Sequence, residues 1–91
     1  MGKAFYVGQC PICCGYGRLE IDKDILKDKL VVICEECLTE WETPQQALKN
    51  IKGQRGSVKG KVRNATFDEI KTQGWDRFVL DISVRREVNG M

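Results

Sequence analysis

The chain has 91 residues and a formal net charge of +2, and 42% of its residues are hydrophobic. This length and composition predict one small domain whose core needs additional stabilisation, for example by a structural metal ion or disulfide bonds. They argue against intrinsic disorder. The chain contains no histidine, which excludes the usual serine and cysteine triads, two-histidine zinc proteases and zinc fingers with mixed ligands. We therefore expect a protein that is not an enzyme.

Apolar runs are short throughout the chain. The longest, residues 30–34, has five residues, whereas a membrane span needs about 20. Residues 1–7 lack the apolar stretch of a signal peptide. We therefore expect a cytoplasmic protein, in which five cysteines indicate metal binding rather than a disulfide framework.

The first part of the chain has the alternation of short strands. Apolar and polar residues alternate over residues 5–7 and again over residues 18–22, which predicts two half-buried strands. Residues 30–33 are rich in β-branched side chains and predict a third strand that pairs with the second. The charged residues 23–29 between them predict the turn of a hairpin.

A first helix is predicted after Thr43. This residue is a plausible N-cap, Pro44 suits the first helical position, and Gln46 completes a capping box. Three apolar residues would share one face of this helix: Ala47, Leu48 and Ile51. We expect Gly53 to end the helix.

The C-terminal part predicts a second helix and a strand. Thr66 and Glu69 form another capping box, and Gly74 is the expected end of that helix. Apolar residues then alternate with polar ones over residues 78–84, which predicts an amphipathic strand. Residues 53–63 are basic and glycine-rich and predict a loop between the two helices.

Four cysteines form two C-x-x-C motifs separated by twenty residues: Cys10, Cys13, Cys34 and Cys37. Each motif places two sulfurs on one side of a turn, and the predicted hairpin returns the second motif to the first. The pattern predicts one structural zinc ion held tetrahedrally, with no position left for a catalytic water. Iron in the same cage remains an alternative.

The motifs C-P-I-C at residues 10–13 and C-E-E-C at residues 34–37 resemble the two knuckles of the zinc-ribbon superfamily, over about the first 45 residues. Knuckles of that superfamily favour glycine directly after the second cysteine, whereas this chain has Cys14 and Leu38 there. Cys14 is therefore an alternative ligand to Cys13, through a C-x-x-x-C turn.

The resemblance, together with the predicted elements, implies an α+β fold. We expect a zinc-ribbon β-hairpin with the first helix over residues 1–52 and the basic loop over residues 53–63. Residues 64–91 would supply the short second helix and the amphipathic strand, packed on the ribbon as one domain.

Two C-terminal segments carry a second resemblance. A-T-F-D-E-I at residues 65–70 and G-W-D-R-F-V at residues 74–79 resemble the ending of small bacterial cysteine-knuckle proteins. Several of those are immunity proteins encoded beside polymorphic or contact-dependent toxins. The resemblance implies that this chain binds and neutralises a partner toxin, and it carries no catalytic residue.

Acidic and basic residues are segregated along the chain. Residues 20–42 carry eight acidic residues and three lysines, whereas residues 49–63 carry six basic residues and no acidic one. A toxin that cleaves nucleic acid has a basic active site, to which the acidic segment would be electrostatically complementary. The expected partner-binding residues are the acidic side chains around the second knuckle, Glu35, Glu36, Glu40 and Glu42, followed by Asp22 and Asp24 in the predicted second strand and the turn after it.

The basic segment supports an alternative, a nucleic-acid-binding zinc ribbon of transcription or translation. Its cations could contact phosphates, but the segment has no aromatic residue on which bases could stack. Protein binding is therefore the preferred class. Trp41 is either the anchor of the acidic surface or a core residue beside the metal, and Trp75 is expected in the core.

Overall fold

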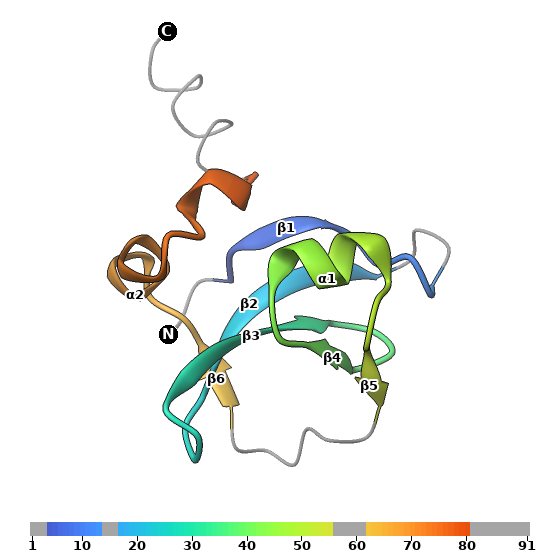
Figure 1. Ribbon diagram of the computed structural model, residues 1–91, viewed down its shortest axis with the longest axis horizontal. Coiled ribbons are helices and arrows are strands. Elements are labelled where there is room, and N and C mark those ends of the chain that lie inside the picture. The colour runs from blue at the N-terminus through green and yellow to red at the C-terminus, as the bar shows by residue number, and fades with distance from the viewer. Residues whose placement is uncertain (1–3, 14–16, 56–61, 81–91) are drawn as a thin grey trace, which may run out of the picture.

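The computed structural model describes residues 4–13, 17–55 and 62–80 (Figure 1). They form a mostly antiparallel sheet with two short helices, as expected for an α+β protein. The elements in chain order are β1 (Tyr6–Gln9), β2 (Arg18–Asp24), β3 (Lys29–Cys34), β4 (Thr39–Trp41), α1 (Pro44–Lys49), β5 (Gln54–Arg55), β6 (Val62–Asn64), α2 (Phe67–Gln73) and the 3-10 helix η1 (Asp76–Phe78).

The sheet is built around the β2–β3 hairpin. Its register runs from Leu19 opposite Cys34 to Asp24 opposite Lys29, which confirms the predicted pairing of these strands. The sheet order is β1-β2-β3-β4-β5, and β6 also pairs with β2. Because β1 pairs with the first half of β2 and β6 with the second half, β1 and β6 lie end to end along one edge of β2.

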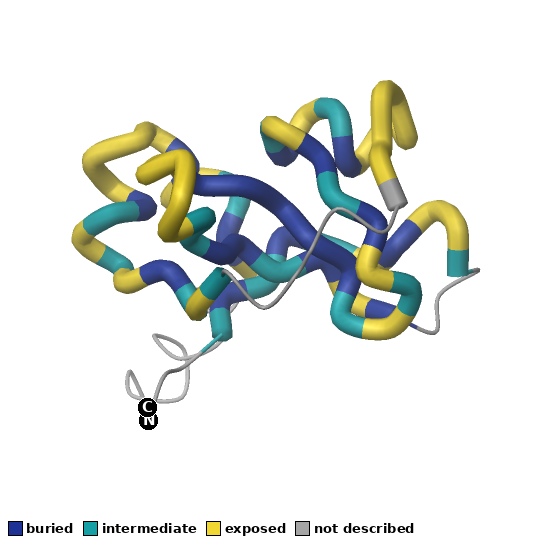
Figure 2. Tube along the Cα trace, turned by 90° about the horizontal axis from the view of Figure 1, so that it is seen from below, coloured by how far each residue is buried: buried dark blue, intermediate teal, exposed yellow. Residues whose placement is uncertain are grey.

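The core lies on the face of the sheet that the helices cover. Helix α1 packs against β1, β3 and β4, and α2 packs against β3 (Figure 1). Buried positions follow the strands through the centre of the molecule, and exposed positions lie in the turns and on the outer sides of the helices (Figure 2). Trp41 is fully buried and Trp75 nearly so, which confirms both as core residues. The interpretation of Trp41 as an anchor for a partner is wrong.

Helix α1 begins at the predicted residue but ends three residues early, and its predicted capping box is only half formed, because Gln46 Oε1 has no hydrogen-bond partner in the described part of the chain. The Gln46 N–H donates to the Thr43 hydroxyl at 3.1 Å, and Pro44 opens the helix. The helix ends at Asn50, whose φ of 55° is left-handed, rather than at Gly53. Asparagine tolerates this conformation better than most residues, so it provides the C-cap. The predicted apolar face is consequently wrong.

Of that predicted face, only Ala47 is buried, and Leu48 and Ile51 are exposed. Gly53 has a different structural role. A Cβ atom at this position would lie 2.7 Å from Trp41 Nε1, so a glycine is needed where the backbone crosses the indole ring.

Helix α2 matches its prediction at both ends. Thr66 and Glu69 form both hydrogen bonds of the capping box, and Gly74 is the left-handed C-cap with a φ of 85°. Arg63 adds two hydrogen bonds to the Glu69 carboxylate at 3.0 and 2.6 Å, which ties β6 to the start of the helix. Among the residues that the structure describes, no helix is long and apolar enough to cross a membrane.

The predicted strand over residues 78–84 is wrong in its first residues. Phe78 belongs to η1, and Val79 rather than Leu80 is buried. The Leu80 N–H donates to the Tyr6 carbonyl at 2.9 Å, so the chain contacts β1 through the backbone there. Residues 81–91 lie outside the described residues. The predicted loop over residues 53–63 contains strand residues at both ends, in β5 and β6, and residues 56–61 also lie outside the described part.

Candidate metal centre

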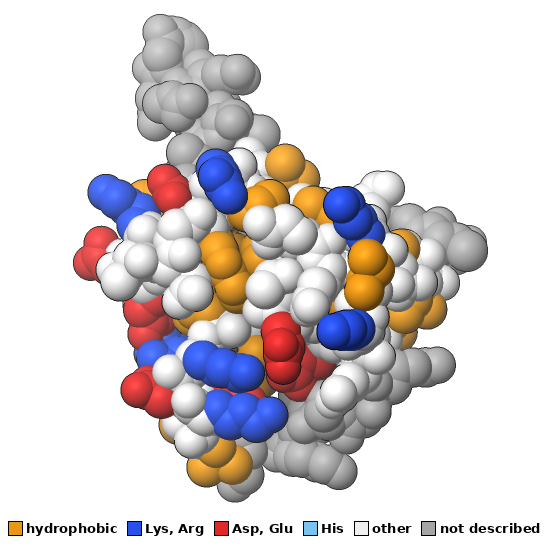
Figure 3. All heavy atoms as spheres, in the orientation of Figure 1, with side chains coloured by type: hydrophobic (Ala, Val, Ile, Leu, Met, Phe, Trp, Pro, Cys, Tyr) orange, Lys and Arg blue, Asp and Glu red, His pale blue; other side chains and the backbone are white. Residues whose placement is uncertain are grey.

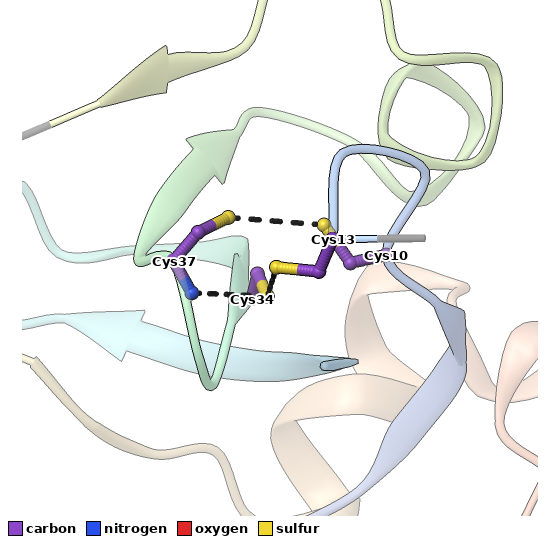
Figure 4. Close-up of side chains that lie close together, drawn as sticks. All are labelled: Cys10, Cys13, Cys34 and Cys37. Atoms are coloured by element: carbon purple, nitrogen blue, oxygen red, sulfur yellow. Dashed lines mark hydrogen bonds between the residues drawn. The ribbon is translucent and has the colours of Figure 1, made fainter. Parts of the chain in front are cut away.

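The two C-x-x-C motifs meet at one end of the β2–β3 hairpin (Figure 4). Cys10 directly follows β1 and Cys13 closes the next turn, whereas Cys34 ends β3 and Cys37 lies in the turn before β4. The four sulfur atoms all lie within 4.8 Å of one another. The structure therefore brings together the four cysteines expected from the sequence.

The spacing between the sulfurs suits a tetrahedral site. Cys10 Sγ lies 3.8 Å from Cys37 Sγ, and Cys13 Sγ lies 3.7 Å from Cys34 Sγ. A tetrahedron with zinc–sulfur bonds of about 2.3 Å has sulfur–sulfur edges of about 3.8 Å. These separations are far longer than a disulfide bond of about 2.05 Å, and all four thiols are free. The arrangement can hold one metal ion.

Backbone contacts position the two motifs. The Cys10 N–H donates to the Gly17 carbonyl at 2.9 Å, and the Glu35 N–H donates to the Arg18 carbonyl at 3.0 Å. These bonds continue the pairing of β2 into both cysteine turns. The first sulfur of each turn is thereby held at the end of the strand that precedes it.

Backbone N–H groups point at the sulfurs, as a thiolate site requires. The Ile12 N–H donates to Cys10 Sγ at 3.3 Å, and the Glu36 and Cys37 N–H groups donate to Cys34 Sγ at 3.3 and 3.4 Å. Hydrogen bonds to a charged acceptor are stronger than neutral ones, so these donors stabilise sulfur in its anionic form.

Leu38 occupies the position where a zinc-ribbon knuckle favours glycine. Its φ is 60°, in the left-handed region, and its N–H donates to the Cys34 carbonyl at 3.0 Å. The turn of the second motif therefore forms with leucine in place of glycine. The left-handed backbone conformation is energetically unfavourable for this leucine. Cys14, the corresponding departure in the first motif, lies outside the described residues. Its replacement of Cys13 as a ligand is therefore still an alternative to the predicted set of four.

Sequence reasoning missed two residues of the site. Thr39 is buried and its hydroxyl lies 3.1 Å from Cys37 Sγ. Gly17 packs so closely on Cys34 that a Cβ atom at this position would lie 2.5 Å from the sulfur. For Gly17, the only signal in the sequence was its position directly before a predicted strand. Nothing in the sequence pattern indicated Thr39.

The four sulfurs cannot all be anionic without a cation. Burial raises the pKa of the Cys10 thiol, and burial together with the neighbouring sulfurs raises that of Cys13 to about 12. Burial also acts to raise the pKa of Cys37, but hydrogen bonds from Thr39, Cys13 and Cys34 together outweigh it and bring the value down to about 6. Bound metal supplies the missing positive charge and displaces the protons.

The chemistry of the four ligand atoms limits which metal ions the site can bind. All four ligand atoms are thiol sulfurs, which prefer zinc, iron or copper(I) over magnesium and calcium. Four protein ligands complete a tetrahedral shell, so the arrangement fits a structural ion better than a catalytic one. The sequence-based expectation of a single ion agrees with this geometry.

The six acidic residues expected to bind a partner are not equivalent in the structure. Glu36 and Glu42 are exposed, and Glu42 pairs weakly with Lys29 at 3.8 Å. Glu35 is half-buried and accepts from Arg18 Nε at 3.0 Å. Glu40 and Asp24 are also half-buried. Acidic and basic side chains are interspersed on the face that carries α1, with apolar side chains between them (Figure 3).

Asp22 has to be removed from that set. Its side chain is only 3% exposed, and its Oδ1 atom has no hydrogen-bond partner in the described part of the chain. Burial and the adjacent Glu20 raise the pKa of Asp22 to about 8. The residue lies on β2, where its side chain faces away from the helices, and strand alternation predicted no such burial.

The chain matches no protein-family model, and no significant match to it was found among curated proteins or solved structures. The likeness to zinc ribbons therefore rests on the four-cysteine arrangement itself.

Proposed function

We propose that the four cysteines hold one structural zinc ion and that the protein is a non-catalytic binding module. The observation that carries this proposal is the spacing of the sulfurs, 3.8 Å between Cys10 and Cys37 and 3.7 Å between Cys13 and Cys34, which matches the edges of a tetrahedral zinc–thiolate site. The N–H groups directed at Cys10 and Cys34 support it, since they favour thiolates. Zinc is preferred to iron because a purely structural role needs no redox change.

Metal analysis of the protein purified without chelators tests this proposal. We expect about one zinc per chain, and we expect a strong chelator to lower the melting temperature by roughly 10 °C or more. A loss of a few kcal/mol corresponds to such a shift in a domain of this size. Stoichiometric iron would replace zinc in the proposal. A metal-free protein whose melting is insensitive to the chelator would refute it.

The surface around the metal centre supports protein binding. Ile12 and Leu38, one at each cysteine turn, are 37% and 48% exposed, and Glu36 beside them is also exposed. A zinc ion with four thiolates adds a net charge of −2 at the same end of the molecule. Apolar side chains within a negative surface suit a partner with a basic, partly apolar surface.

A nuclease toxin has such a surface at its active site, so we propose that the chain is an immunity protein that binds and neutralises a bacterial toxin. The loose resemblance of residues 65–79 to immunity proteins is consistent with this role. The nucleic-acid alternative loses support because Arg63, one of the six cations of the basic segment, is paired with Glu69. A matched set of charge reversals tests the partner class.

Tagged protein would be used to capture partners from a lysate of its own cells. Glu36→Lys combined with Glu42→Lys should abolish the capture of a basic protein, whereas Asp76→Lys, at an exposed acid near the start of η1, should not. Equal capture by all variants would exclude the acidic surface. Recovery of RNA instead, lost steeply as salt rises, would favour the nucleic-acid alternative.

A further inference from the structure

Thr39 places a hydroxyl group directly beside a ligand sulfur. The residue begins β4, its side chain is 1% exposed, and Oγ1 lies 3.1 Å from Cys37 Sγ. A buried hydroxyl needs a hydrogen-bond partner, and among the described residues the Cys37 sulfur is in position to be that partner. The contact is therefore a feature of the interior and not a chance surface encounter.

The orientation of this hydroxyl is constrained because both the backbone and the methyl group of Thr39 are held in place. Strand β4 pairs with β3 and with β5, so the backbone of Thr39 is held within the sheet. A Cβ atom on Gly53 would lie 2.9 Å from Thr39 Cγ2, which shows that the methyl group packs closely against the Gly53 backbone. Because a β-branched side chain has few rotamers, a fixed methyl group fixes the hydroxyl as well.

We propose that Thr39 is a positioning residue of the metal centre, donating a hydrogen bond from its hydroxyl to the Cys37 thiolate and thereby limiting the negative charge on that sulfur. The inference rests on the proposed metal site. A metal-bound thiolate carries no proton, so the threonine hydroxyl is the only donor in this pair. Hydrogen bonds of this kind tune metal affinity and the electronic properties of the ligand sulfur.

Cys37 differs from Cys10 and Cys34 in having a side-chain donor, the Thr39 hydroxyl, in addition to the backbone N–H of Thr39. Cys10 and Cys34 receive hydrogen bonds from backbone N–H groups, which no substitution removes cleanly. Among the described contacts, Cys37 is the one ligand that receives a side-chain hydroxyl. The contribution of this bond can therefore be measured by replacing a single residue.

Cobalt(II) bound in place of zinc gives an absorption spectrum that depends on the ligand sulfurs. A residue with a purely structural role would not change this spectrum. In Thr39→Val the shape of the side chain is kept but the hydroxyl is lost, so the uncompensated thiolate is more easily oxidised. We expect the sulfur-to-cobalt charge-transfer band to move to longer wavelength and the affinity for zinc to fall about 10–100-fold. Thr39→Ser keeps the hydroxyl, so its band should stay at the wild-type position although packing against Gly53 is lost.

Controls separate this inference from the proposal on which it rests. Thr72→Val, at an exposed threonine of α2, should leave the band and the affinity unchanged. Thr39→Ala, which needs no extra room, replaces the valine variant if that variant does not fold. A wild-type spectrum and affinity in Thr39→Val would overturn the role of the hydroxyl, whereas a wild-type protein without tetrahedral cobalt bands would overturn the metal site itself.

Discussion

Gly17 and Cys34 are in contact through the backbone of one and the sulfur of the other. A Cβ atom at Gly17 would lie 2.5 Å from Cys34 Sγ and 3.0 Å from the Cβ of Glu36. Glycine is therefore needed at this position for steric reasons, because any larger residue would push the second cysteine turn away from the first. The contact links the start of β2 to the geometry of the proposed metal centre.

Gly17→Ala is accordingly expected to destabilise the protein by about 1–3 kcal/mol and to weaken zinc binding, since overpacking displaces the sulfur. Denaturant unfolding and competition with a chromogenic chelator would measure the two effects. Gly74→Ala is the matched control. Its φ of 85° makes alanine unfavourable by about 1 kcal/mol, but no atom of the described residues beyond its chain neighbours lies within 4 Å of the added methyl group, so zinc affinity should be unchanged. Equal zinc affinities for wild type and Gly17→Ala would contradict the proposed contact.

Leu38→Gly should stabilise the isolated protein by about 0.5–1 kcal/mol. The leucine has a φ of 60° and is half exposed, so glycine relieves backbone strain while losing little buried surface. The same variant should weaken binding of the proposed partner, because it removes an apolar contact beside the metal. Thermal unfolding and the capture assay measure these effects separately. A variant that is less stable than wild type would show that the leucine is retained for packing and not for binding.

Asp22→Asn should change the dependence of stability on pH. Because burial raises the pKa of Asp22 in the folded protein, to about 8, folding binds a proton at any pH between the unfolded value of about 4 and this value. The contribution of Asp22 to stability is therefore greatest at low pH and is lost as the pH rises through that window. We expect a fall of up to about 1 kcal/mol per pH unit between pH 6 and 8 in the wild type.

The asparagine variant should remove most of that slope and be more stable than the wild type at pH 8, on the order of 1–3 kcal/mol. Asp24→Asn, two residues along the same strand, is the control and should keep the wild-type pH dependence. Unfolding by urea at a series of pH values, with zinc in excess, measures both. If the unfolding free energies of wild type and Asp22→Asn depended on pH in the same way, the buried carboxyl group would not be the cause of the pH dependence.

Local signals in the sequence predicted the parts of the structure that depend on local interactions. The β2–β3 hairpin follows from alternation and a charged turn, and the spacing of the four cysteines then determines where the sulfurs meet. The capping box of Thr66 and Glu69 and the glycine at position 74 define α2 at both ends, because caps act within one turn of the chain.

Features that depend on tertiary contacts could not be predicted in this way. Gly53 has the same appearance in the sequence as a helix-ending glycine, but its function is to let the chain pass close to Trp41. Alternation over residues 78–84 indicated a strand, whereas the 3-10 turn at Asp76–Phe78 places Val79 in the core instead. The buried state of Asp22 and the hydroxyl–sulfur contact of Thr39 likewise arise only when strands far apart in sequence are assembled.

X-ray absorption at the metal edge of the natively purified protein tests the central claim most directly. We predict a zinc edge and a first shell of four sulfur atoms at about 2.3 Å, with no nitrogen or oxygen ligand. A shell that contained oxygen, or fewer than four sulfurs, would contradict the closed four-cysteine site on which the proposed function depends.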